Sequence, residues 1–406
     1  MKTLVGALVL TAILVLPCMS PAQQYNITGA GARAEGFGGA FIGVADDATA
    51  VVWNPAGLSL LDQPQASVVG KLIGEKSNYT DQLSASNNES TSLSHAVFNF
   101  GSLAFPVKLG GMKLVLAAAY QRQLDFYNSY KVPGYGSEER GGVDTFTPGV
   151  GLQVSPLISF GLAANIWFGS DSYNSTYNSP TTNNPNSSSS GSPSGFNLVA
   201  GAMLDLRGLK SPVPLKIGAS LRTPFILKTD YTFNWTPSLF GLVPDAKATS
   251  KADMPLMVGF GASYQIGENL TVAADFETRA YGSKKQITDY TTSIVSFSDT
   301  SNMSASKKDL NQFRVGAEYL IVSDAGVFPI RAGYHNVPTL LAYSDINGKP
   351  TDKQVVGDGF SVGTGYISGS FALDLTFSRV SYEAGGVNST TDYTQTTFVG
   401  SVIFYF

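Results

Sequence analysis

Cysteine, histidine and charged side chains are all scarce in this sequence of 406 residues. The single cysteine, Cys18, excludes a small extracellular module held together by disulfides. With only two histidines the chain has too few ligands for a zinc site of the usual kind, so we expect neither metal nor cofactor. Charged residues make up 14% of the chain, against about 25% in soluble domains. The net charge of -4 argues against a nucleic-acid partner.

The sequence also lacks an apolar run long enough for a transmembrane helix. The run at residues 4–16 has 13 residues, whereas a helix that crosses a bilayer needs about 20. A proline ends this run, and Ser20 and Ala22 supply the small residues of a cleavage site. We therefore interpret residues 1–22 as a secretory signal peptide. Lipoprotein processing at Cys18 is the alternative, but proline stands where a small residue should precede the cysteine.

What the sequence has instead is glycine, aromatic residues and alternation of apolar with polar side chains. It contains 43 Gly, 24 Phe and 19 Tyr. A period of two, the pattern of a strand with two different faces, recurs along the chain. In one example Phe371, Leu373, Leu375 and Phe377 share a face, and Asp374 and Thr376 lie on the other.

Three features favour a transmembrane barrel over a soluble β-sandwich. Aromatic residues such as Tyr120 and Phe168 lie near strand ends, where barrels carry interfacial girdles. Short turns alternate with long polar connections, of which residues 170–194 are an example. The chain ends on an alternating strand whose last residue is Phe406. We predict an all-β fold, a transmembrane antiparallel β-barrel of about fourteen strands in the outer membrane of a Gram-negative bacterium.

The predicted barrel occupies residues 65–406, and its even number of strands places both ends on the periplasmic side. Residues 23–64 do not alternate and are rich in Gly and Ala, so we expect an N-terminal plug, or hatch, inside the lumen. We expect a monomer surrounded by outer-membrane lipid. The predicted strands are residues 65–73, 95–107, 112–127, 144–154, 157–168, 195–207, 214–232, 254–266, 269–281, 312–322, 327–336, 359–367, 370–382 and 394–406.

No motif indicates an enzyme. Residues 359–363 spell the Gly-x-Ser-x-Gly of a nucleophile elbow, which requires a turn from strand to helix and a downstream histidine. Here the residues continue a strand, and both His95 and His335 lie upstream. We expect no catalytic residue.

Many charged residues should point into the lumen, because they alternate with the apolar face. One interpretation is a mutually paired network; the other is that Arg222 and Arg314 hold a substrate carboxylate by charge-assisted hydrogen bonds. An apolar ligand would need a local pocket, since each buried methylene contributes about 0.8 kcal/mol. The lumen-facing candidates for that pocket are Trp167, Val199, Met203 and Met257.

The connection at residues 233–252 is unusually apolar for an outer loop. It contains Trp235, Leu239, Phe240 and Leu242, and such side chains need a reason to be exposed. They either pack on one another over the barrel mouth or form a landing site for an apolar ligand.

The sequence resembles the FadL/TodX family of outer-membrane transporters in an ordered set of short motifs. The set begins with Gly36-Phe37-Gly38-Gly39-Ala40, Ala45-Asp46-Asp47-Ala48 and Trp53-Asn54-Pro55-Ala56-Gly57-Leu58. It continues with Arg222-Thr223-Pro224, Gly316-Ala317-Glu318-Tyr319 and Arg331-Ala332-Gly333-Tyr334.

The resemblance implies a fourteen-stranded barrel closed by a plug, which takes up long-chain fatty acids or other hydrophobic compounds, or binds detergent, without an energy source. It implies that movement of the plug near Asn54, Pro55 and Ala56, together with a lateral opening in the wall, releases the ligand. The polar stretch 170–194 departs from the apolar landing groove of the family. Two alternatives remain open: a PorV-like barrel that is a shuttle or partner in protein secretion, and a non-selective porin.

Overall fold

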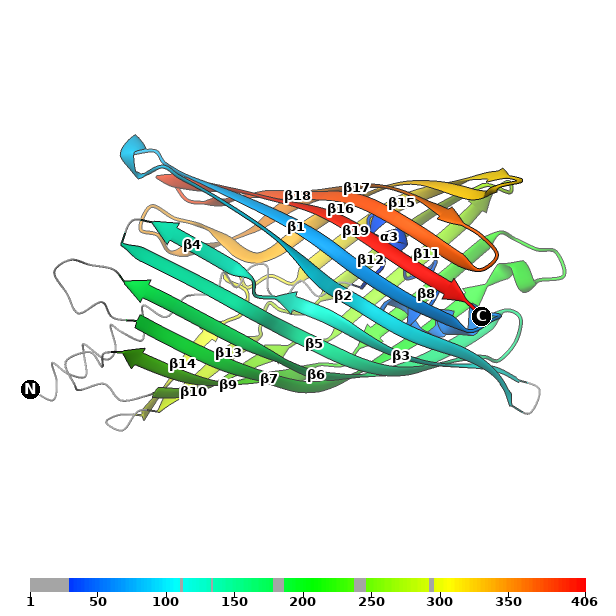
Figure 1. Cartoon of the computed structure of the whole chain (residues 1–406), viewed down its shortest axis with the longest axis horizontal. Coiled ribbons are helices and arrows are strands. Elements are labelled where there is room, and N and C mark those ends of the chain that lie inside the picture. The colour runs from blue at the N-terminus through cyan, green and yellow to red at the C-terminus, as the bar shows by residue number, and fades with distance from the viewer. Residues whose placement is uncertain (1–28, 110–111, 133, 178–185, 237–245, 292–295) are drawn as a thin grey trace, which may run out of the picture.

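The strands of the computed structural model form one antiparallel sheet that closes on itself (Figure 1). The structure describes residues 29–109, 112–132, 134–177, 186–236, 246–291 and 296–406, so the predicted signal peptide and Cys18 lie outside it. Closure occurs because β1 (Gln65–Asp81) pairs with β2 (Glu89–Leu109) on one edge and with β19 (Ser389–Tyr405) on the other. Since Gln65 faces Tyr405, both ends of the barrel chain lie on the same rim, as predicted.

Within the described ranges, nineteen strand segments make up a barrel of fourteen strands, because five of the strands are each interrupted once. Pro224 lies between β8 and β9, and Pro255 between β10 and β11; proline has no N–H for the ladder. The predicted fold class and strand number are confirmed.

The remaining segments are β3 (Met112–Asp125), β4 (Asn128–Val132), β5 (Tyr135–Gln153), β6 (Ile158–Tyr177), β7 (Asn186–Asp205), β8 (Leu215–Arg222), β9 (Phe225–Thr236), β10 (Ala246–Met254), β11 (Met257–Ile266), β12 (Leu270–Arg279), β13 (Lys285–Thr291), β14 (Ser296–Asn302), β15 (Leu310–Ser323), β16 (Gly326–Ser344), β17 (Pro350–Ile367) and β18 (Phe371–Gly385), with short 3-10 turns η2 (Ala85–Asn87) and η3 (Leu206–Gly208).

The two faces of the wall differ as the alternation predicts. The outer face exposes large apolar side chains, including Phe98, Phe260 and Phe360, each more than half exposed. The inner face buries charged side chains, among them Glu318, Arg331 and Asp374. A wall that is apolar outside and polar inside suits a barrel surrounded by lipid.

The predicted strand bounds were too short at the outer rim. The stretch 170–194, predicted as a loop, continues β6 as far as Tyr177 and resumes in β7 at Asn186. Strand β1 likewise runs to Asp81 rather than residue 73. Above the membrane both faces of a strand can be polar, so the alternation that marks a strand disappears although the backbone ladder continues.

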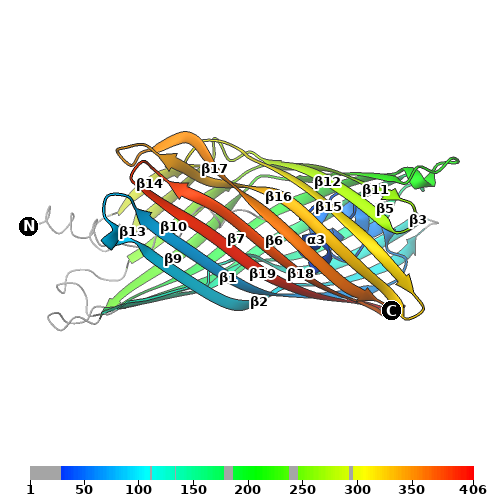
Figure 2. The same ribbon diagram turned by 90° about the horizontal axis from the view of Figure 1, so that it is seen from above.

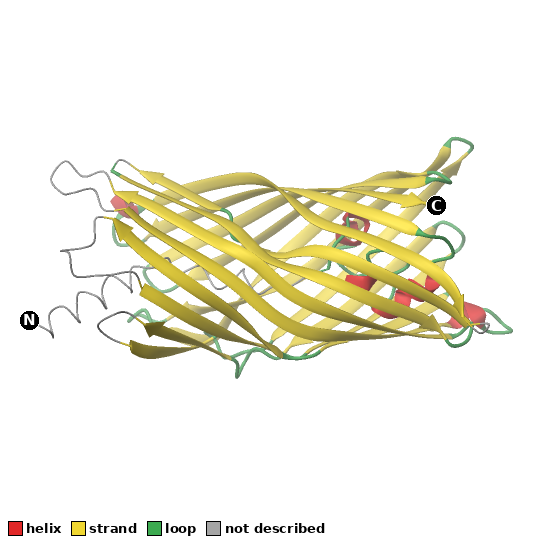
Figure 3. Cartoon of the chain, turned by 60° about the horizontal axis from the view of Figure 1, so that its bottom comes forward, coloured by secondary structure: helices red, strands yellow, loops and turns green. Residues whose placement is uncertain are grey.

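The lumen at the rim that holds the C-terminus is filled by residues 29–64, which we call the plug. Its elements are α3 (Ala32–Gly36), α4 (Ala50–Trp53) and the 3-10 helix η1 (Pro55–Leu60). Figure 2 shows α3 inside the barrel, and Figure 3 shows most of the red helical segments toward the end where the C-terminus lies. None of the helices in the described part of the chain has the length and apolar character to cross a membrane.

Candidate functional site

The plug lies directly against the barrel wall because the wall presents glycine to it. A Cβ atom built on Gly316 would come within 2.2 Å of the Phe37 carbonyl oxygen, and one on Gly161 within 2.1 Å of the Pro55 carbonyl carbon. Real Cβ atoms do not approach so closely, so only glycine allows this contact. The high glycine content of the sequence therefore has a structural reason: it lets plug and wall pack backbone to backbone.

Asn54 is the fully buried centre of the contact between plug and wall. Its Nδ2 donates to the carbonyl oxygen of Ile42 at 3.0 Å and to that of Ala202, on β7, at 3.2 Å. Its Oδ1 accepts from the N–H of Ala56 at 3.2 Å and so caps η1, whose first residue is Pro55. Asn54 thereby joins two parts of the plug to the barrel.

A chain of ion pairs joins the plug to the opposite wall. Arg33 of the plug pairs with Asp46 at 2.5 Å and with Glu318 of β15 at 3.0 Å. Glu318 also accepts from Arg331 of β16 at 2.6 Å, and Arg331 reaches Asp374 of β18 at the same distance. These side chains pair with one another, as the paired-network interpretation expects for this part of the inner face, although Arg331 Nη2 has no hydrogen-bond partner among the described residues.

The electrostatics within the plug follow from burial and from these pairs. Burial would raise the pKa of the Asp46 carboxyl, but the charges of Arg33 and Lys216 outweigh that effect and hold the pKa below its usual range. For Asp47, burial is the largest effect and raises the pKa. Since the pKa of Asp46 is lowered, its ion pairs stabilise the plug above about pH 4 and weaken as the pH falls further.

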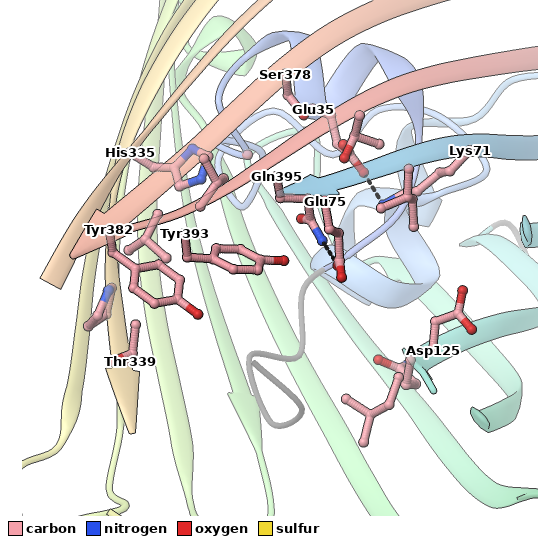
Figure 4. Close-up of a pocket in the computed structure, with 18 of the residues that line it drawn as sticks. Glu35, Lys71, Glu75, Asp125, His335, Thr339, Ser378, Tyr382, Tyr393 and Gln395 are labelled. Carbon is pink, nitrogen blue, oxygen red and sulfur yellow. Dashed lines mark hydrogen bonds and ion pairs between the residues drawn. The ribbon is translucent and has the colours of Figure 1, made fainter. Parts of the chain in front are cut away.

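Between the plug and the outer rim the lumen holds a cavity of about 730 Å³, a size suited to a small molecule. Gly29, Gly38, Gly39 and Trp53 of the plug contribute to its lining. The remaining lining residues come mainly from β1, β2, β3, β16, β18 and β19 (Figure 4). We call this space the lumen cavity; it mixes apolar with polar and charged side chains.

The wall beside the lumen cavity contains a break in strand pairing, which we call the lateral opening. Among the described residues, pairing between β2 and β3 ends at Phe100 and Gln121. Beyond this point residues 89–98 of β2 pair with β1 alone, while β3 and β4 pair with β5. Side chains span the gap: His95 Nε2 lies 2.7 Å from Asp125 Oδ2, and the His95 ring lies 4.4 Å from that of Tyr127. All three residues line the lumen cavity.

The fold matches solved structures along nearly the whole chain. A FadL homologue from Pseudomonas aeruginosa aligns with a TM-score of 0.66 and 13% identity, over 94% of this chain and 99% of its own. The toluene transporter TodX of P. putida aligns with a TM-score of 0.65 and 14% identity, over 94% and 99% of the two chains. The fold is that of the FadL and TodX channels.

The Ralstonia pickettii toluene transporter TbuX shares this fold, with a TM-score of 0.60 and 14% identity over 94% of this chain and 100% of its own. No protein-family model matches the chain, and no curated protein matches its sequence. The FadL/TodX fold is therefore visible in the structure, whereas in the sequence only short motifs carry it.

Within the FadL/TodX fold, both predicted arginines contact the plug. Arg314 lines the lumen cavity; its Nη2 donates to Gln312 at 2.6 Å, and its Nη1 has no hydrogen-bond partner among the described residues. Its guanidinium carbon lies 5.8 Å from the centre of the Trp53 ring. Arg222 donates to the carbonyl oxygen of Val52 at 2.5 Å and does not line the cavity.

The apolar candidates divide into two groups. Trp167 and Met257 belong to a buried cluster inside the outer half of the barrel, where the Trp167 indole donates to Asn197 and lies 4.9 Å from the Phe225 ring. Val199 and Met203 pack in the cluster formed around the plug. None of the four candidates is among the residues that line the lumen cavity.

The predicted landing site lies mostly outside the described residues. Leu239, Phe240 and Leu242 lie outside the described residues. Trp235 lies near the end of β9, where its backbone pairs with Ser187 of β7 rather than forming a loop.

Sequence reasoning missed most of the polar lining of the lumen cavity. Lys71, Glu75, His95 and Asp125 all line it, as does Tyr382. Lys71 lies within the predicted strand 65–73, and extending the alternation of that strand would have placed Glu75 on the inner face beside it. The described residues contain no group of three potential metal-ligating side chains.

Proposed function

We propose that this chain is an outer-membrane channel for the passive uptake of hydrophobic compounds, such as long-chain fatty acids or hydrocarbons, gated by the plug. The observation that carries the proposal is the lumen cavity, which has the plug as its floor and the lateral opening in its side. A compound held there could leave through the wall without passing the plug. Each methylene transferred from water contributes about 0.8 kcal/mol, so binding requires no energy source.

The structure of the plug is compatible with gating, because the plug is held to the wall by a few separate hydrogen bonds and ion pairs that can break and re-form. Asn54, Pro55 and Ala56 form one contact, and the ion pairs of Arg33 form another. A shift of the plug would reshape the cavity floor at Trp53 and Arg314, which is a two-state change that ligand binding can bias. Arg314 lies at this floor, but its Nη1 is buried and its Nη2 lies 3.5 Å from Glu277 Oε1, so the apolar part of a ligand, and not a carboxylate, supplies the binding energy.

The two alternative functions have less support. An open porin conflicts with the plug, which occupies the lumen with fully buried residues such as Phe37, Phe41 and Leu58. A secretion partner is not favoured, because the similar solved structures are described as a FadL homologue and as hydrocarbon channels. Uptake by a monomer remains our expectation.

Closing the lateral opening tests the proposal. The variant His95→Cys/Asp125→Cys would be bridged with a short, reducible bis-thiosulfonate reagent in cells that make the protein and otherwise lack such a channel. We expect uptake of radiolabelled toluene and oleate to fall to the level of cells without the protein, and to recover after reduction. The two single-cysteine variants, treated in the same way, control for damage by the reagent. Unchanged uptake in the bridged variant would show that the opening is not the route.

A further inference from the structure

One side of the lumen cavity carries a carboxylate beside two stacked aromatic rings. Glu75 of β1 lies opposite Gln395 of β19, and Tyr393 of β19 lies opposite Tyr382 of β18. All four residues line the cavity, and Figure 4 shows them together on neighbouring strands. We call this group the Glu75 patch. It belongs to neither the plug nor the lateral opening.

The Glu75 carboxylate has no cation to neutralise it. Its Oε1 accepts a hydrogen bond from Gln395 Nε2 at 2.8 Å, and no basic side chain in the described part of the chain forms an ion pair with it. The nearest lysine along the inner face of β1, Lys71, is already bound to Glu35 of the plug. A carboxylate left without a counter-charge in a partly enclosed space favours a positively charged ligand.

The neighbouring rings have the second property that an organic cation needs. The Tyr382 and Tyr393 rings stack with centroids 4.8 Å apart and an interplanar angle of 24°. An aromatic face attracts an ammonium group through its quadrupole and also packs against the carbons attached to the nitrogen. A carboxylate and aromatic faces together recognise an organic ammonium group better than a metal ion, which would require further oxygen ligands.

The charge of the whole cavity agrees with this chemistry. Its lining includes the carboxylates of Glu35, Glu75 and Asp125, but only Lys71 and Arg314 as permanent cations. Arg314 is itself offset by Glu277, whose Oε1 lies 3.5 Å from Nη2. The lining is therefore negative in balance, and it disfavours an anion more than a cation.

We propose that the Glu75 patch binds the ammonium group of an amphiphilic organic cation, a compound with a primary or quaternary amine on an apolar body. The apolar body would lie along Ile73, Val380 and Leu341, which also line the cavity. This inference rests on the proposed function for the direction of transport, but binding itself can be measured without transport.

Binding to the purified protein in lipid nanodiscs tests the inference. Isothermal titration would compare benzyltrimethylammonium with benzyl alcohol and phenylacetate, which are small, soluble probes of different charge. We expect the cation to bind at least tenfold more tightly than phenylacetate. Glu75→Gln should raise the Kd for the cation at least tenfold, or about 1.4 kcal/mol. Tyr382→Leu should also weaken binding, whereas Tyr382→Phe, which keeps the ring, should not.

The matched control is Glu383→Gln, because Glu383 follows Tyr382 on β18 and is exposed on the opposite face. Heat-modifiable migration in gels would verify that each variant has a folded barrel. Equal affinity of the wild type and Glu75→Gln for the cation, or tighter binding of phenylacetate, would overturn the inference. Loss of toluene uptake on bridging the lateral opening is a separate result, so the two proposals can fail independently.

Discussion

Asn54 shows how one side chain can determine whether the plug stays in place. It satisfies three backbone groups, at Ile42, Ala202 and Ala56, in a region without solvent. A buried polar group that loses its partner costs about 1–3 kcal/mol. In Asn54→Ala we expect docking of the plug to weaken by about 3 kcal/mol, seen as faster hydrogen exchange across residues 29–64. Uptake of hydrophobic substrate should fall, because the ordered cavity floor is lost.

The control for this variant is Asn234→Ala, in which an exposed asparagine of β9 is replaced. Its hydrogen exchange and its uptake should match those of the wild type. Both barrels should assemble, since Asn54 contributes nothing to strand pairing. Wild-type exchange and uptake in Asn54→Ala would mean that this residue does not hold the plug.

At the level of single residues, the sequence predicts which face of a strand a side chain lies on better than it predicts which residue that side chain contacts. The alternation along the strand correctly placed Arg314 and Glu318 on the inner face, because successive strand residues point to opposite sides of the sheet. It could not reveal that Glu318 meets Arg33, which is 285 residues away along the chain. It also could not separate Arg314, which lines the cavity, from Arg222, which is held by the plug. Those distinctions depend on how the plug is seated.

At the level of elements, strand β15 owes its fit against the plug to one glycine. Because the Phe37 carbonyl oxygen would lie 2.2 Å from a Cβ on Gly316, we expect Gly316→Ala to displace the plug or the strand at a cost of about 1–3 kcal/mol. Hydrogen exchange of residues 32–41 would report the displacement. Gly400→Ala on β19 is the matched control, since its Cβ would meet nothing within 4 Å. Equal protection of the plug in both variants would contradict the glycine argument.

The centres of the strands could be predicted from sequence, and their outer ends could not. Within the bilayer one face of each strand must be apolar, so residues such as Phe371, Leu373 and Leu375 reveal the strand. The extension of β6 and β7 to Tyr177 and Asn186 is rich in Ser and Asn and has no such requirement. The lateral opening between β2 and β3 is equally hidden, because it depends on which neighbour each strand pairs with along its length.

At the level of the whole molecule, the plug separates this barrel from an open pore. The wall behind it is charged, with Lys216, Glu318, Arg331 and Asp374 buried against plug residues rather than in contact with water. Removal of the plug would expose these side chains to solvent, which a barrel lumen accommodates. The wall itself is closed by strand pairing that does not involve the plug, from β1 through β19.

We therefore expect a variant lacking residues 29–60 to assemble as a barrel and to conduct ions in a planar lipid bilayer, whereas the wild type should show no steady conductance. The deleted segment fills the lumen, and the exposed inner face would hydrate once it is gone. Heat-modifiable migration would first establish that the variant is folded. Steady conductance of the wild type would favour a porin, and a folded but silent variant would mean that residues other than the plug close the lumen. Conductance in the variant alone would identify the plug as the barrier that a gated channel must move.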